Sequence, residues 1–130
     1  SASSVLDVDS SSNLKFNSGY GSVETAYGVR AWATIDGTGT VSNRASGNVT
    51  STTDNGTGDF THNFTNNMGN DDFALTAGSN GTSIDGTNSY AMYYDGGEAT
   101  TSSVTTHHRT DAGTYLDVKY IMGMVAGDLA

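Results

Sequence analysis

Residues 31–67 carry the pattern that most constrains the fold, because short alternating runs are separated there by glycine-containing turns. In residues 29–35, apolar residues occupy every second position and Trp32 lies between two of them. A two-residue period places successive side chains on opposite faces of a strand. Asp36-Gly37 then provides the positive φ that a tight hairpin requires. This part of the chain is therefore predicted to form β-hairpins, and it contains no recognisable catalytic motif.

A second strand is predicted from residue 40 to residue 49, and residues 54–58 form the next strong turn. Phe60, His62 and Phe64 follow this turn at alternate positions, so they share one face of a further strand. We expect the two phenylalanines to anchor the contact between two sheets.

Further strands are predicted at residues 73–77, 90–94, 104–109 and 115–125, separated by Asn-Gly, Asp-Gly and Ala-Gly turn signals. With the strands above, this makes about eight, at intervals typical of a sandwich. The predicted fold is therefore all-β: an antiparallel β-sandwich, jelly-roll-like or Ig-like, which forms a single domain over residues 26–130.

Residues 1–25 are predicted to form a short N-terminal arm with weak strand character, because two apolar patches flank a polar run there. Such an arm is suited to docking on a neighbouring subunit. In the predicted strand 90–94, two adjacent tyrosines point to opposite faces, so at least one of them should be exposed or at an interface. The residues that we predict for an oligomer or assembly interface are Val5, Leu6, Val8, Leu14, Phe16, Tyr93 and Tyr94.

Composition limits the classes of partner. Fourteen acidic residues against five basic ones give a formal charge of −9, which repels nucleic acid and anionic membrane surfaces. We therefore expect no nucleic-acid binding, and no apolar run is long enough to suggest membrane insertion. The absence of cysteine excludes disulfides and thiolate zinc sites. A hydrophobic fraction of 35% allows only a thin core, which favours a homo-oligomer that buries more surface between copies.

Two kinds of acidic segment raise the question of a cation. Residues 54–59 superficially resemble a calcium loop, but Thr65 stands where an EF-hand requires its bidentate glutamate, so a turn is the favoured interpretation. Residues 70–72 and the pair Asp7 and Asp9 offer carboxylates for structural calcium between subunits, although solvated loop charges are favoured. We predict no metal site and no cofactor, with structural calcium left as a less favoured alternative.

The sequence contains no catalytic constellation, and we predict that the chain is not an enzyme. His107 and His108 are adjacent, so on a strand they point to opposite faces and cannot bind one ion together. Trp32 is expected to pack in the core. The alternative is that Trp32 joins Tyr90, Tyr93 and Tyr94 in a sugar-stacking surface.

Five segments carry a resemblance to a known family: residues 31–40 (AWATIDGTGT), 44–46 (RAS), 54–59 (DNGTGD), 63–66 (NFTN) and 126–130 (AGDLA). In these segments the chain resembles small virion proteins of marine tailed phages, which are often labelled tail-fibre proteins. The resemblance spans most of the chain.

The resemblance implies a structural protein on the virion exterior, at the surface of the capsid or the tail. We expect a homo-oligomer, with a trimer favoured, whose partners are other virion proteins such as major capsid or tail proteins, and with a host surface glycan as a further potential partner. Small size and the lack of a shaft favour a capsid decoration (cement) protein. The first alternative is a short tail fibre or fibre tip, and the second is a carbohydrate-binding module.

Overall fold

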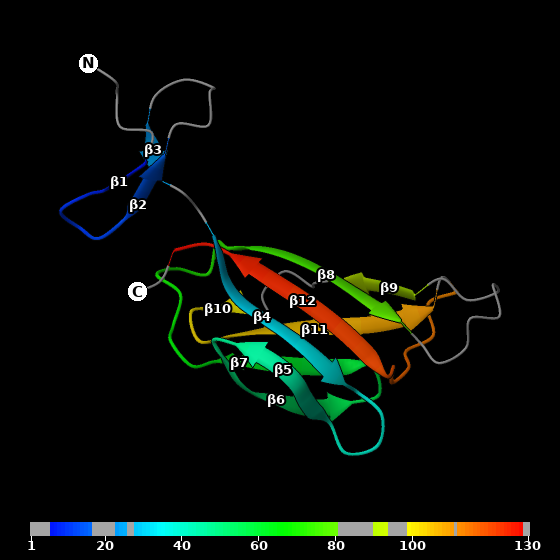
Figure 1. Cartoon of the computed structure of the whole chain (residues 1–130). Helices are drawn as coiled ribbons and strands as arrows, with labels where there is room; N and C mark the ends of the chain where they lie inside the picture. The colour runs from blue at the N-terminus through cyan, green and yellow to red at the C-terminus, as the bar shows by residue number, and fades with distance from the viewer. Residues whose placement is uncertain are drawn as a thin grey trace.

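The computed structural model describes residues 6–16, 23–25, 28–80, 90–93, 99–110 and 112–128. All the secondary-structure elements in these ranges are β-strands, and the strand pairs are antiparallel. None of the described segments is a helix that is long and apolar enough to cross a membrane. The two larger sheets form a β-sandwich, so the predicted fold class is confirmed (Figure 1).

The sandwich consists of a four-stranded and a five-stranded sheet. The first has the order β5-β4-β12-β8 and contains β4 (Val29–Asp36), β5 (Ser42–Gly47), β8 (Ala74–Asn80) and β12 (Tyr120–Ala126). The second has the order β10-β11-β7-β6, with β9 also paired to β11, and contains β6 (Val49–Gly56), β7 (Asp59–Phe64), β9 (Tyr90–Tyr93), β10 (Ala99–Thr100) and β11 (Ser103–Thr110).

The strand predicted over residues 40–49 is in fact two strands in different sheets. It breaks at Asn48, whose φ of 56° lies in the left-handed region that asparagine tolerates better than most residues. The Asn48 side chain also stabilises this break through two hydrogen bonds. Its Oδ1 accepts from the backbone N of Asn66 at 2.7 Å, and its Nδ2 donates to the Asn66 carbonyl at 3.1 Å. The chain therefore passes from β5 in one sheet to β6 in the other.

The strand predicted over residues 115–125 begins later, at Tyr120. The residues before it form an irregular segment that is held to the sandwich by backbone hydrogen bonds. The N of Leu116 donates to the His108 carbonyl at 3.2 Å, and the Val118 carbonyl accepts from the N of Gly37 at 3.0 Å. These bonds go to different sheets, so the segment closes one end of the sandwich and does not extend β12.

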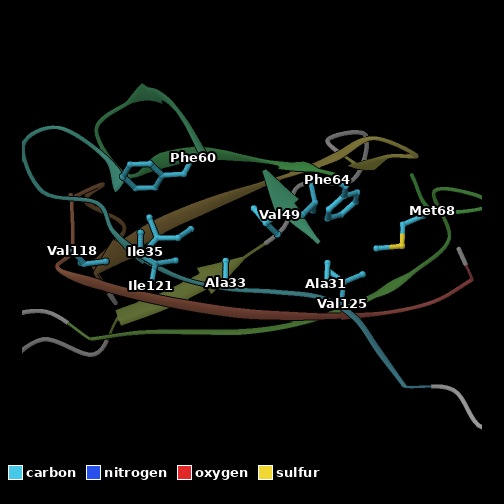
Figure 2. Packing of buried hydrophobic residues seen from close by; sticks show 11 residues of the cluster. Ala31, Ala33, Ile35, Val49, Phe60, Phe64, Met68, Val118, Ile121 and Val125 are labelled. Carbon is cyan, nitrogen blue, oxygen red and sulfur yellow. The ribbon is translucent and has the colours of Figure 1, made fainter. Parts of the chain in front are cut away.

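The core lies between the two sheets. Phe60 and Phe64 point from β7 toward Ile35, Ile121 and Val125 of the opposite sheet (Figure 2). The predicted sheet-to-sheet anchoring by the two phenylalanines is thus confirmed. The full cluster of buried apolar residues comprises Ala31, Ala33, Ile35, Val49, Phe60, Phe64, Met68, Val104, Val118, Ile121 and Val125.

The described part of the predicted arm forms a small sheet of its own, in the order β1-β2-β3. Its strands are β1 (Leu6–Val8), β2 (Leu14–Phe16) and β3 (Glu24–Thr25). Asp9 fixes the turn between β1 and β2, because its carboxylate accepts hydrogen bonds from the backbone N of Ser11 at 2.9 Å and of Asn13 at 3.0 Å. These bonds, those to Asn13 first, lower the pKa of Asp9. The predicted domain boundary at residue 25 stays a prediction.

Candidate interaction surface

The four-stranded sheet exposes large apolar side chains on its outer face. Trp32 of β4 is 43% exposed, and Tyr120, Met122 and Met124 of β12 are 39%, 46% and 47% exposed. Each alternates with a core residue on its strand, so all four project away from the core. We call these four residues the outer apolar face. Apolar patches that are exposed together on a folded domain mark interaction sites more often than isolated apolar residues do.

The strand register brings these side chains together. Met124 lies opposite Trp32 on β4 and opposite Thr76 on β8, and Met122 lies opposite Thr34 and Gly78. Because Thr34, Thr76 and Gly78 are small, the surface is hollowed beside the two methionines. The hollow has a volume of about 400 Å³ and is lined mainly by Trp32, Thr34, Thr76, Gly78, Met122 and Met124.

The Trp32 indole lies over Gly47, its partner in the register on β5. A Cβ atom at position 47 would overlap the indole Nε1 and lie 2.9 Å from its Cδ1, so only glycine leaves room for this ring position. The prediction that Trp32 packs in the core is therefore wrong, because the core-facing positions of β4 belong to Ala31, Ala33 and Ile35. The indole instead covers the backbone at Gly47, and its other side is exposed to solvent.

The charges around the outer apolar face are compensated. Asp36 and Arg44 form an ion pair, and the Arg44 guanidinium lies 4.7 Å from the centre of the Tyr120 ring. Hydrogen bonds from the Thr38 side chain and backbone, together with Arg44, lower the pKa of Asp36. Arg30 lies at the other end of β4 and donates from Nε to the Gly127 carbonyl at 2.9 Å. The Asp36 carboxylate at this face is thus compensated by Arg44, although the whole chain carries a formal charge of −9.

The outer face of the five-stranded sheet is polar by contrast. Asn63 Nδ2 donates to the hydroxyls of Ser51 at 3.2 Å and Thr53 at 3.1 Å. The Thr61 hydroxyl lies 2.7 Å from that of Thr105 and accepts from Asn55 Nδ2 at 2.8 Å. These cross-strand bonds form a ladder of hydroxyl and amide groups, so the two broad surfaces of the sandwich differ in chemistry.

The structure places the predicted interface residues in separate regions. Val8 and Leu14 are exposed and lie opposite each other in the arm sheet, where the backbones of Leu6 and Phe16 also pair. Tyr93 lies in β9, where it pairs with His107 in the five-stranded sheet. Val5 and Tyr94 lie outside the described residues. The described arm residues and Tyr93 therefore belong to different sheets, and their role at an interface stays a prediction.

Sequence reasoning missed Met122 and Met124, although the sequence holds a signal for them. In residues 120–126, apolar side chains occupy both sets of alternate positions. A strand that is apolar on both faces is typical of one that is covered on both sides. In β12 one of those faces packs in the core and the other is the outer apolar face.

Two histidines form a second notable cluster, inside the sandwich. His62 is 7% exposed and His108 is fully buried; the two are joined through the Thr106 hydroxyl, which lies 2.8 Å from His62 Nε2 and 3.2 Å from His108 Nε2. Burial lowers the pKa of His62 to about 4. The pKa of His108 is also lowered to about 4, mainly by burial and to a smaller extent by the charges of His62 and His107. Neutral imidazoles sealed in the core cannot contact a substrate.

The acidic segment 54–59 is engaged in local hydrogen bonds. Asp54 Oδ1 accepts from the backbone N of Gly56 at 3.0 Å, and Asn55 Nδ2 donates to Asp59 Oδ1 at 3.0 Å, as in an ordinary turn. Across the described ranges, no three His, Cys, Asp or Glu side chains gather as a metal site would require.

Comparisons with protein-family models, curated proteins and solved structures found no match for the chain.

Proposed function

We propose that this chain is a non-enzymatic structural protein on the exterior of a tailed-phage virion, most consistent with a homo-oligomeric capsid decoration protein. The observation that carries the proposal is the outer apolar face, an uncovered sheet surface on a thin, acidic sandwich. The resemblance of residues 31–66 to small virion proteins supports the placement. The self-association is argued from the surface itself.

Burial of this face supplies the driving force for association. Covering a side chain of this size contributes about 1.5–3 kcal/mol when it is removed fully from water. Four such side chains lie on this one face, and the hollow lined by Trp32, Met122 and Met124 has room for an opposing side chain. The face thus offers both projecting side chains and a space that a neighbouring copy can fill; in a trimer, the contact pairs this face with a different patch of the next copy.

Electrostatics favour a second copy at this face. Two molecules with a charge of −9 repel each other over most of their surfaces. At the outer apolar face the Asp36 carboxylate is paired with Arg44, and Arg30 adds a positive charge. Repulsion between copies is therefore weaker at this face, where the described carboxylate is already paired. The exposed Val8 and Leu14 of the arm stay a predicted second contact.

The wild-type protein is expected to be an oligomer, with a trimer favoured. The double variant Met122→Ser/Met124→Ser is expected to be a monomer. The substitutions remove the centre of the outer apolar face and leave the core side chains of β12 in place. Sedimentation equilibrium at micromolar concentration measures the mass, and circular dichroism checks the fold. The control is Tyr115→Ser, which removes another exposed ring at a distant site. A wild-type monomer, or a double variant that associates like the wild type, contradicts self-association at this face.

Copy number on the purified particle tests the placement. Hundreds of copies per virion are expected of a decoration protein, whereas a few sets of three confined to the tail are expected of a short tail fibre or fibre tip. Quantitative mass spectrometry gives the ratio to the major capsid protein, and labelled antibody seen by electron microscopy gives the location. Absence of the chain from washed particles contradicts the virion proposal even if the purified protein forms oligomers.

A further inference from the structure

A second hollow lies at the opposite side of the sandwich from the outer apolar face. It has a volume of about 240 Å³ and is lined by Gly56, Thr57, Asp59, His107 and Tyr115. We call it the Tyr115 hollow. Its volume is below the range of about 300–1,000 Å³ that is usual for drug-sized ligands, so its occupant is about one ring in size.

The walls of the hollow are held in place before any ligand arrives. The Gly58 carbonyl accepts from the backbone N of His108 at 2.7 Å, and the Gly58 N donates to Asp117 Oδ1 at 2.8 Å. Gly58 has a φ of 68°, and a Cβ atom there would lie 2.9 Å from the Leu116 N. The turn between β6 and β7 is thus pressed against β11 and residues 112–118. A fixed site loses little conformational freedom when it binds.

The hollow stays open because glycine lines it. A Cβ atom added at Gly56 would meet no atom within 4 Å, so the space above this residue is empty. Tyr115 forms one wall: its ring centre lies 5.9 Å from that of His107 at an interplanar angle of 71°. Tyr115 is nevertheless 42% exposed, so part of its ring surface faces solvent.

The polar groups of the hollow suit hydroxyl groups. Asp59 accepts from Asn55 Nδ2 through Oδ1, and its Oδ2 has no hydrogen-bond partner among the described residues. A carboxylate oxygen accepts hydrogen bonds from two neighbouring hydroxyls, and the Thr57 hydroxyl both donates and accepts. An aromatic ring beside such groups complements the C–H face of a sugar ring. This combination is typical of sugar recognition and unlike the apolar hollow on the other sheet.

The charge around the hollow selects among sugars. Asp54, Asp59 and Asp117 all belong to this end of the sandwich, whereas Arg109 is the one cation that β11 contributes nearby. Sialic acids, uronic acids and phosphorylated sugars are therefore disfavoured by repulsion. We propose that the Tyr115 hollow binds a single neutral hexose or N-acetylhexosamine unit. This inference is independent of the proposed virion location and of self-association at the other face.

The test is a titration followed by ¹H–¹⁵N NMR spectra of the full chain. The ligands are glucose, galactose, mannose, N-acetylglucosamine and N-acetylgalactosamine, with sialic acid and glucuronate as anionic controls. At least one neutral sugar is expected to shift the amide signals of Gly56, Gly58 and His107, with a dissociation constant on the order of 1 mM. The anionic sugars are expected to leave these signals unchanged.

Two variants locate the site. Tyr115→Ser and Asp59→Asn are each expected to weaken binding by about tenfold or more. Trp32→Ser removes the exposed ring of the other sheet and is expected to bind like the wild type. Spectra of the free variants verify the fold. The inference is overturned if no neutral sugar in the panel shifts these signals, if Tyr115→Ser binds normally, or if the shifts gather around Trp32.

Discussion

Lowering the pH from 7 to 4 is expected to reduce the free energy of unfolding by several kcal/mol, because His62 and His108 are buried as neutral imidazoles. Each has a pKa of about 4 in the folded chain against 6.5 as the ordinary value. The unfolded chain therefore takes up these protons first. The stabilisation is complete above pH 6.5 and is lost as the pH falls toward 4, with about 3 kcal/mol for each histidine.

The hydrogen bonds around the two rings explain why protonation is unfavourable. The Thr52 hydroxyl donates to Asn43 Oδ1 at 2.7 Å, so it accepts from His62 Nδ1, which is 3.3 Å away. His62 Nε2 then accepts from the Thr106 hydroxyl, and Thr106 accepts from His108 Nε2. His108 Nδ1 is left as a buried atom with no partner among the described residues. A proton there would have no acceptor, and a proton on His62 would force Thr106 to turn.

Urea unfolding followed by Trp32 fluorescence at pH 7, 5.5 and 4.5 measures this effect at a fixed protein concentration. The lowered pKa of Asp9 and of Asp36 acts in the same direction, but mainly below the ordinary carboxyl value of 3.8. The control is the double variant His62→Gln/His108→Gln, whose stability is expected to change little over this pH range. A wild-type free energy of unfolding that is constant from pH 7 to 4.5 contradicts the prediction.

Phe60→Ala is expected to lower the free energy of unfolding by about 3–5 kcal/mol. Phe60, near the start of β7, is fully buried; its ring centre is 5.7 Å from that of His108, and a Cβ atom at Gly37 would lie 2.9 Å from its Cζ. Its neighbours include Gly37, which follows β4, and His108 of β11, so they belong to different sheets and cannot all move in to fill the space.

A loss of this size is a large share of the stability of a domain, which is about 5–15 kcal/mol in total. Chemical unfolding at pH 7 measures it, and Phe60→Leu is expected to lose less because it leaves a smaller cavity. Leu14→Ala, at an exposed position of the arm sheet, is expected to change the free energy by less than about 0.5 kcal/mol. A cost for Phe60→Ala that is no greater than that of Leu14→Ala contradicts its place in the core.

Alternation along the chain was sufficient to predict the fold class and part of the core. Ala31, Ala33 and Ile35 form one face of β4, and Phe60 and Phe64 face them, because a two-residue period determines which side chains share a strand face. The same pattern did not reveal the passage from β5 to β6. That passage depends on the backbone angle of Asn48 and on its bonds to Asn66, which is distant in sequence.

The candidate surface was harder to predict for a similar reason. Alternation separates Trp32 from the core residues of β4, but it does not show which side of the sheet the other sheet covers. That outcome depends on the position of β12 between β4 and β8, which brings Met122 and Met124 beside Trp32. The predicted interface in the arm and at Tyr93 relied on local apolar patches and lacked this information.

The contrast between the two broad sides of the sandwich limits how far copies can accumulate. The four-stranded sheet carries the outer apolar face, whereas the outer face of the five-stranded sheet carries Asn, Ser and Thr side chains that are hydrogen-bonded to each other. If the apolar side is covered by a neighbouring copy, the side that remains outward carries this polar ladder, whose groups already bond to each other. In the proposed assembly, this difference between the two sides favours a single layer of copies over continued stacking into fibrils.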